Sequence, residues 1–397
     1  MTNNDTAASR NANNARISKI RDLLSAREMG VYYSLLILVV LLSFATSYMG
    51  RPSYLSALNI TNVLYQSSLV SIMAVGMTIV LITGNIDLSV ASLAALSAAV
   101  MVALCDHIGF AGASIVALFI AAACGLLNGL IVQYLKVNAF ITTLGTMTAL
   151  RGIILVLSDG RSISANTSEA RLAMQVVESS RVGVGHVFLV LAFLLAIVAV
   201  IVAIYAKNNP GHVRRHVVVI AAVLVAMLIA GLAIPAQATV AIPVIYAGTI
   251  ALIAWFITTY TVLGRRLYAV GGNPEAARLS GINIRAYKIG GFVLCSIMAC
   301  IAGILFGCRL SSVNPNALQG AELTVIAATI IGGTSLFGGA GSVVKSVAGS
   351  ILLFTLTNGF NILNLGANSQ GIVEGVVIIA AAAVYTLGES RSRKVVD

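Results

Sequence analysis

The sequence predicts an all-α polytopic membrane protein, and three observations lead to that fold class. Hydrophobic residues make up 59% of the 397 residues and charged residues only 9%, whereas a soluble globular chain carries roughly 25% charged residues. The apolar residues form long continuous runs, unlike the short alternating strands of a membrane β-barrel. Most of these runs approach the ~20 residues that a helix needs to cross a bilayer. Composition thereby excludes a soluble enzyme, a disordered chain and a single-span anchor.

The order of apolar runs and polar loops predicts a transmembrane helical bundle of about twelve spans. The spans are predicted at 31–49, 66–84, 86–105, 111–133, 139–157, 184–206, 217–235, 243–262, 289–308, 322–337, 343–361 and 370–387. The run 322–337 is short and leads into the glycine cluster 332–341, which indicates a broken or re-entrant segment. Such backbone is tolerated in a membrane only inside protein or along a cavity. Ten or eleven spans are the alternative, if 322–337 does not cross or if 66–105 packs differently.

The distribution of basic residues predicts the orientation of these spans. With the N-terminus inside, 18 of the 24 Lys and Arg residues fall on the cytoplasmic side, five fall outside and Arg151 lies within a span. Because cytoplasmic loops are enriched in Lys and Arg, both termini are predicted to be cytoplasmic. We therefore expect a cytoplasmic N-terminal arm at 1–30, a transmembrane domain at 31–387 and a cytoplasmic tail at 388–397. The net charge of +11 is then a topological signal rather than a sign of nucleic-acid binding.

The sequence carries no motif for a metal, a cofactor or ATP. The five cysteines are odd in number and have no zinc-site spacing. The segment GAGSVVKS at 339–346 approaches a phosphate-binding loop, but Val344 stands where such a loop requires glycine. The chain is therefore predicted to have no ATPase site of its own and not to be an enzyme. A membrane-embedded enzyme is disfavoured further because no nucleophile–base constellation is visible.

The segment LGRRLYAVGGNPEAARLSGINIRAYK at 263–288 contains the signals of a short capped helix in a cytoplasmic loop. Asn273 is a good N-cap, and Pro274 suits the first helical position, where its missing N–H costs nothing. Glu275 favours the positive helix N-terminus, and Gly281 is suited to a left-handed end. These residues predict a helix of about two turns at 274–280. It is either a simple structured turn or a knob that docks in a groove of a cytoplasmic partner.

This loop, GRRLYAVGGNPEAARLSGINI, resembles the coupling loop of the inner-membrane permeases of bacterial monosaccharide ABC importers. Three further blocks are similar to that family in the same order along the chain. They are AVGMTIVLITGNIDLSVAS at 74–92, FITTLGTMTALRGI at 140–153 and IGGTSLFGGAGSV at 331–343. The resemblance is closest to xylose-type permeases, which carry an extra helix pair that here corresponds to part of 184–235. It implies a ten-helix core plus that pair, in the bacterial inner membrane.

The resemblance also implies partners for the chain. Two permease copies would form a homodimer, a separate ABC ATPase subunit would dock on each coupling loop, and a periplasmic sugar-binding protein would deliver a monosaccharide, with a pentose such as xylose favoured. No cofactor is implied. The ATPase contact would be formed by Gly271, Gly272, Asn273, Pro274, Glu275, Ala276, Ala277, Arg278, Leu279, Ser280 and Gly281.

A neutral sugar needs a path lined by uncharged polar groups, and several predicted spans contain them. The candidate pathway or central polar residues are Asp87, Ser89, Asn128, Thr142, Thr143, Arg151, Asn358 and Glu374. The alternative is that these residues bond neighbouring helices to one another, because the same residue types do so in membranes. For Asp87, capping of the helix that begins near residue 88, together with Ser89, is a specific alternative.

Two weakly similar halves, a common feature of transporters, are indicated by the likeness of 80–92 to 329–342. Arg151 and Glu374 are each followed by glycine and an apolar run, which predicts that they pair near the centre. The alternative is that each charge reaches polar groups of its own. An ion-coupled secondary transporter of a small neutral solute is the rival function, disfavoured because charges within the spans are sparse.

Overall fold

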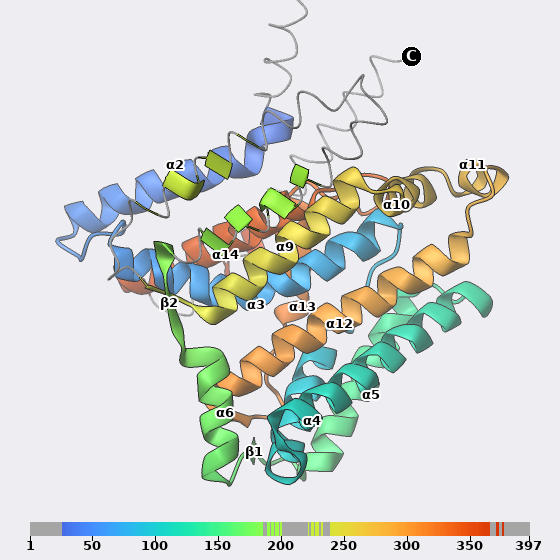
Figure 1. Ribbon diagram of the computed structural model, residues 1–397, viewed down its shortest axis with the longest axis horizontal. Coiled ribbons are helices and arrows are strands. Elements are labelled where there is room, and N and C mark those ends of the chain that lie inside the picture. The colour runs from blue at the N-terminus through green and yellow to red at the C-terminus, as the bar shows by residue number, and fades with distance from the viewer. Residues whose placement is uncertain are drawn as a thin grey trace, which may run out of the picture.

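The computed structural model describes residues 26–185 and 239–365 continuously, together with single positions between 189 and 232 and residues 371, 372, 375 and 376. In Figure 1 these residues form long helices that run side by side between two ends of the molecule. Seven described helices are long and apolar enough to cross a membrane. The predicted class, an all-α polytopic membrane protein, is therefore confirmed, whereas the total of twelve spans stays a prediction.

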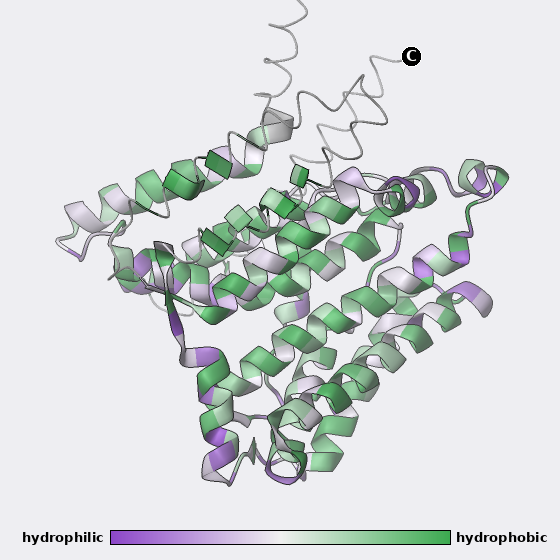
Figure 2. Ribbon diagram, in the orientation of Figure 1, coloured by the Kyte–Doolittle hydropathy of each residue, from purple (hydrophilic) through white to green (hydrophobic). Residues whose placement is uncertain are grey.

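The long helices carry the hydrophobic residues, which Figure 2 shows in green along their length. They are α2 (Ala26–Tyr48), α3 (Ala57–Ile82), α4 (Val90–Tyr134), α5 (Ala139–Ser158), α9 (Ile242–Tyr260), α12 (Ile284–Leu310) and α14 (Val343–Leu363). The shorter helices are α6 (Ser168–Ser179), α10 (Val262–Gly272), α11 (Pro274–Leu279) and α13 (Ala321–Ile331). Strand β1 (Ile163–Ser164) pairs antiparallel with β4 (Ser312–Val313), and β2 (Arg181–Gly183) with β3 (Thr239–Ala241).

Several boundaries differ from the predicted ones for local reasons. Helix α4 contains most of the predicted span 86–105 and all of the span 111–133, which are joined at a kink where Gly109 has φ 72°. Helix α3 begins at Ala57 rather than near residue 66, because the Ser56 side chain accepts a hydrogen bond from the Asn59 N–H and caps an earlier, more polar turn. Hydropathy alone therefore located the membrane core of each helix but not its ends.

The predicted span 322–337 is a short helix in the structure. Helix α13 has 11 residues and ends at Gly332, after which Gly333 has φ 80°. At 1.5 Å per residue it is about 16 Å long, roughly half of a ~30 Å hydrocarbon core. The structure thus agrees with a broken segment and not with a full span.

The hydrophobic core lies where α12 packs against α3 and α4. Phe292, Ile72, Leu93 and Met101 are fully buried there. Glycine makes the contact close, because a Cβ on Gly303 would overlap the backbone carbonyl of Ala94. Small residues at helix crossings are the usual way in which membrane helices approach one another.

The loops separate into the same two groups that alternating spans require. Figure 1 places α10 and α11 at one end of the bundle, and α6 and β1 at the opposite end. The last residue of α3, Ile82, and the residues Gly338 and Gly339 lie at this end of α10, since they contact Gly271. Which end faces the cytoplasm stays a prediction from the basic residues.

Other predicted features fall mainly outside the described residues. They are most of the arm 1–30, most of the extra helix pair at 184–235, the predicted last span 370–387 with Glu374, and the tail 388–397. Residues 26–30, which were assigned to the arm, belong to α2. Within the extra pair, the described Leu195 packs with Leu224 and with Trp255 of α9.

Candidate functional site

The predicted short helix of the coupling loop is α11, which ends at Leu279 rather than at Ser280. The Asn273 side-chain oxygen accepts a hydrogen bond from the Ala276 N–H at 3.0 Å, and Pro274 occupies the first turn. Gly281, with φ 77°, donates its N–H to the Arg278 carbonyl at 2.9 Å. Each end of α11 is therefore closed by the residue that the sequence predicted for it.

The outer surface of α11 is exposed. Ala277 is buried, whereas Leu279 is 78% exposed. Glu275 and Arg278 form an ion pair at 2.6 Å, with both side chains about two-thirds exposed. An ordered helix that presents an unburied leucine beside a charged pair has the composition of a docking surface.

Helix α10, which leads into α11, was not predicted. It begins after Thr261, whose side chain accepts a hydrogen bond from the Gly264 N–H. The signal available in the sequence was this cap, followed by Leu267 and Val270 on one face. The Tyr268 hydroxyl donates to the Gly341 carbonyl at 2.9 Å. Burial raises the pKa of Tyr268, so the phenol stays protonated and able to donate.

The end of α10 meets two other segments through backbone contacts. The Gly339 N–H donates to the Ile82 carbonyl at 2.9 Å. A Cβ added to Gly271 would overlap that Ile82 oxygen and stand 2.7 Å from the Gly339 nitrogen. We call the contact of Ile82, Gly271 and Gly339 the glycine junction. It joins the coupling loop to the end of α3 and to the loop before α14, so three of the four resembling blocks converge here.

The similar blocks 80–92 and 329–342 end their helices in the same way. After α3, the Gly84 N–H donates to Leu81 at 2.8 Å and the Asn85 N–H to Val80 at 3.2 Å. After α13, the Gly333 N–H donates to Ile330 at 2.8 Å and the Thr334 N–H to Thr329 at 3.0 Å. Both are the hydrogen-bond pattern of a Schellman motif with a left-handed glycine, so the sequence likeness corresponds to a likeness of local structure.

The structure brings Asp87, Ser89 and Asn128 into one buried network. The Asp87 Oδ1 atom accepts from the Ser89 N–H at 2.9 Å and from the Ser89 hydroxyl at 2.5 Å. Asn128 donates to Ser89 at 3.2 Å and accepts from Thr146 at 2.6 Å. This chain links the start of α4 to its second half and to α5, which is the bonding role that was weighed against a pathway role.

The local turn at Asp87 differs in detail from a simple helix cap. Ser89 precedes α4 but its side chain makes no capping hydrogen bond. Asp87 instead closes an Asx turn on the Ser89 N–H, while the Leu88 N–H donates to Thr143 at 3.1 Å. The second carboxylate oxygen of Asp87 has no hydrogen-bond partner among the described residues. Thr142 bonds within α5, to the Asn138 carbonyl.

A second buried polar seam, between α3 and α14, was missed. Ser71 and Ser350 share a hydrogen bond of 2.5 Å, and Thr78 donates to Ser346 at 2.8 Å. The signal available was spacing, because residues seven apart on α3 and four apart on α14 share a helix face. Asn358, a predicted pathway residue, lies further along α14. It is 8% exposed, and its side-chain oxygen has no partner in the described part of the chain.

Arg151 contacts backbone carbonyls rather than a described carboxylate. Its guanidinium donates to the Ala317 carbonyl at 2.6 Å and to the Pro315 carbonyl at 3.4 Å. Glu322 lies near enough for its charge to act on Arg151. Glu374 lies outside the described residues, so its pairing with Arg151 stays a prediction. The observed hydrogen bonds agree with the alternative, in which Arg151 binds polar groups other than Glu374.

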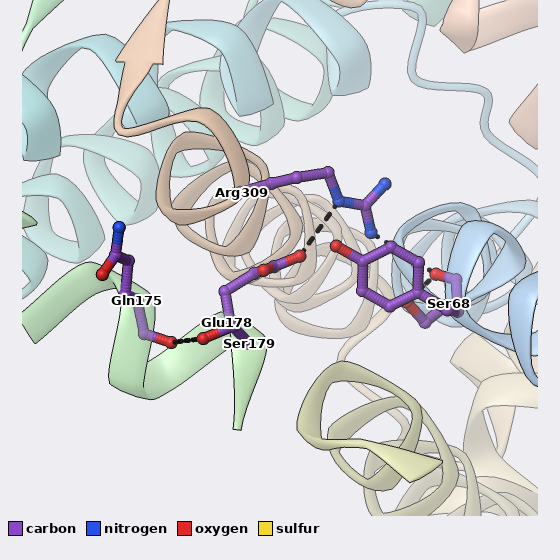
Figure 3. Close-up of polar contacts among 6 residues, drawn as sticks. Ser68, Gln175, Glu178, Ser179 and Arg309 are labelled. Atoms are coloured by element: carbon purple, nitrogen blue, oxygen red, sulfur yellow. Dashed lines mark hydrogen bonds and ion pairs between the residues drawn. The ribbon is translucent and has the colours of Figure 1, made fainter. Parts of the chain in front are cut away.

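At the end opposite α11, an ion pair connects three helices. Figure 3 shows Arg309 between Glu178 and an aromatic ring. The Arg309 Nε atom lies 3.2 Å from Glu178 Oε1, and the guanidinium lies 3.9 Å from the centre of the Tyr65 ring. We call Tyr65, Glu178 and Arg309 the outer clamp, because it ties α6 to the ends of α3 and α12. The sequence had identified Glu178 and Arg309 only as loop charges.

The loop before α6 is held at this end by a carboxylate. Asp106 accepts hydrogen bonds from the Asn166 N–H at 2.8 Å, the Thr167 N–H at 3.1 Å and the Thr167 hydroxyl at 2.8 Å. Thr167 in turn caps α6 through the Ala170 N–H. The region 158–183 is thus an ordered segment that is hydrogen-bonded to the Asp106 side chain of α4.

A helical membrane protein with an exposed capped helix at one end, and buried polar seams between its core helices, has the architecture of a permease. Residues 59–382 match the family model described as branched-chain amino acid transport system / permease component. Because the match covers most of the chain, the chain belongs to this permease family.

Relatives confirm the resemblance drawn from the four motifs. The ribose import permease protein RbsC of Escherichia coli (strain K12) is 35% identical over 352 residues, which are 88% of this chain and 92% of the relative. The xylose transport system permease protein XylH of the same strain is 34% identical over 384 residues, covering 93% and 95%. XylH of Haemophilus influenzae is 32% identical over 377 residues, covering 93% and 99%. No solved structure matches the chain significantly.

Proposed function

We propose that the chain is the membrane permease subunit of an ABC importer that translocates a monosaccharide. Two copies would form the complex, a separate ABC ATPase would power it from the cytoplasmic side, and a periplasmic binding protein would deliver the sugar. A pentose is the favoured substrate, with xylose first. The observation that carries the proposal is the exposed helix α11, held to the bundle through the glycine junction in a chain whose relatives are sugar permeases.

Docking of an ATPase on α11 is supported by the way the helix is mounted. Its exposed Leu279 and its ordered caps suit a helix-in-groove contact. Helix α10 connects it to a junction made of backbone atoms, and rigid secondary elements are among the carriers of coupling between distant sites. A push on α11 is thereby expected to reach α3 and α14. The coupling residues 271–281 are proposed as this contact.

A neutral sugar as substrate is supported by the second buried seam, between α3 and α14, which is built of hydroxyls alone. Xylose is supported by alignment length, since the XylH match covers 93% of the chain and the RbsC match 88%. That difference is consistent with an extra helix pair of the xylose type.

Association with an ATPase is the first test. The tagged chain is expected to co-purify with an ABC ATPase from its own cells, and Leu279→Ser to weaken that association. Leu310→Ser is the matched control, because Leu310 is 61% exposed at the opposite end of the molecule. Equal recovery of the ATPase with both variants would contradict docking through α11.

Uptake of labelled sugars is the second test. Cells with and without the chain are compared for xylose, ribose, galactose and arabinose, and we expect chain-dependent import of xylose above the others. Deletion of the ATPase should abolish that import. Import that persists without the ATPase would replace this proposal with an ion-coupled secondary transporter.

A further inference from the structure

The segment 314–320, between β4 and α13, is a tightly folded connection. The Ala317 N–H donates to the Asn314 carbonyl at 2.9 Å, and the Asn316 N–H to the Asn314 side-chain oxygen at 2.8 Å. Leu318 and Gly320 are left-handed, with φ 58° and 86°. We call 314–320 the re-entrant segment, for the position described next.

Two helix-length comparisons place this segment short of the ends of α14 and α5. Gly332, at the end of α13, contacts Lys345, near the start of α14. From that level α14 runs on to Leu363, about 27 Å, whereas α13 reaches back only about 16 Å to its start. The start of α13 is therefore about 10 Å short of the end of α14. Arg151, which binds Ala317, likewise lies seven residues or about 10 Å before the end of α5.

The segment directs carboxamides away from the protein at that depth. Val313 and Pro315 are buried, whereas the side chains of Asn314, Asn316 and Gln319 are exposed. An amide that faces lipid without a hydrogen-bond partner costs several kcal/mol. Non-helical backbone with outward amides is therefore expected to face water or a polar solute rather than the bilayer.

Arg151 fixes this arrangement. Its guanidinium donates to the carbonyls of Ala317 and Pro315, so it holds the backbone, while the residues Asn316 and Gln319 stay exposed. On α5, the exposed Thr148 lies three residues before Arg151 and shares its helix face. A threonine hydroxyl is thereby added to the same polar surface.

We propose that Asn316 and Gln319 contact the hydroxyl groups of the monosaccharide as it enters from the outer side, and that Arg151 is the positioning residue that holds them. Each carboxamide offers two donor hydrogens and an acceptor oxygen, which matches a hydroxyl that both donates and accepts. Neither carboxamide carries a charge, so neither attracts an ion that would compete with a neutral sugar for the site. This inference rests on the proposed function and adds the sugar-contacting residues to it.

Uptake kinetics of the complex, assembled with its ATPase and binding protein in vesicles, test the inference. Asn316→Ala and Gln319→Ala are each expected to lower the uptake rate at limiting sugar about three- to tenfold, the size of one lost hydrogen bond. The ratio of the uptake rates for two pentoses should change as well, because each carboxamide contacts a particular hydroxyl and pentoses differ in the placement of their hydroxyls. Arg151→Gln should shift that ratio too, whereas a purely structural role would lower both rates equally. Gln175→Ala is the matched control, an exposed carboxamide on α6 that should leave rates and ratios unchanged.

Thiol labelling gives a direct readout of contact. Gln319→Cys should react with a membrane-impermeant thiol reagent from the outer side, above the background of the native cysteines. Binding protein loaded with xylose should slow that reaction, and empty binding protein should not.

Three outcomes would overturn the inference. If the variants keep wild-type rates and ratios, the amides do not contact the sugar. If instead they impair assembly of the two permease copies, the segment is a subunit contact. If the wild-type chain imports none of the sugars tested, the proposed function and this inference fail together, whereas an active wild type with unaffected variants contradicts only the inference.

Discussion

The two ends of the bundle are held together by different kinds of contact. At the end of α10 and α11, backbone meets backbone in the glycine junction, and the described ion pair there, Glu275 with Arg278, is exposed and lies within one helix. At the opposite end, charged side chains add to the short backbone strand pairs β1–β4 and β2–β3. Arg309 binds Glu178 and Tyr65, and Asp106 binds the loop before α6.

This difference indicates which end transmits movement and which end can separate. Backbone contacts at a glycine have no rotamers to change, so elements joined there are expected to shift together. A side-chain clamp can open by rotation of χ angles and close again. We therefore expect the coupling end to move as one block with α11, and the outer clamp to be a contact that can open and close at the other end.

The largest effect is expected from a methyl group in the glycine junction. Gly271→Ala would place a Cβ against the Ile82 carbonyl and the Gly339 nitrogen, neither of which can rotate away. Overpacking against backbone should cost about 3 kcal/mol and abolish uptake. Gly272→Ala is the control, since its Cβ would meet only an ordinary contact at 3.7 Å. Thermal unfolding compares the stability of the two variants, and uptake is measured for Gly271→Ala; equal stability of the two variants would contradict the junction.

The outer clamp should depend strongly on its charge pair. Glu178→Gln leaves Arg309 without an anion in a mostly buried position, with side-chain exposures of 10% and 23%. We expect a loss of about 1–3 kcal/mol in the free energy of unfolding. The exposed pair offers the contrast, because Glu275→Gln should cost less than about 0.5 kcal/mol. A loss of the same size for both variants would remove the distinction between the two ends.

The buried network should show an intermediate effect. Asn128→Ala deprives Ser89 and Thr146 of their shared partner. Ser89 keeps its bond to Asp87 and Thr146 its bond to the Thr142 carbonyl, so the loss of two side-chain hydrogen bonds should lower the free energy of unfolding by about 1–2 kcal/mol. Thr148→Ala is the control on α5, where the exposed hydroxyl bonds only to its own helix. Thermal unfolding in detergent compares them, and a neutral Asn128→Ala would argue against a bonding role.

The smallest effect on stability is expected at the cap of α11. Asn273→Ala removes the acceptor for the Ala276 N–H, which is worth about 1 kcal/mol of helix stability. The global unfolding temperature should hardly change, while recovery of the ATPase falls. Asn273→Ser keeps a capping oxygen and should restore the recovery. Failure of the serine to restore it would show that α11 acts through the asparagine itself and not through its order.

Local signals predicted much of what the structure contains. The cap at Asn273, the first-turn Pro274 and the terminal Gly281 lie within ten residues of one another, and the helix between them formed as predicted. The short run 322–337 was correctly singled out as broken. These features are readable because their causes, capping and helix length against bilayer thickness, lie within one stretch of chain.

The sequence by itself determined the membrane class, the order of the spans and the capped helix, because hydrophobicity, positive charge and capping act along the chain. The tertiary structure alone decided which distant groups meet. Gly271 lies against Ile82, Arg309 against Glu178, and Arg151 against the backbone of Ala317. Those contacts depend on how helices far apart in sequence pack together. The sequence around a buried charge or glycine does not identify the residue that it will contact.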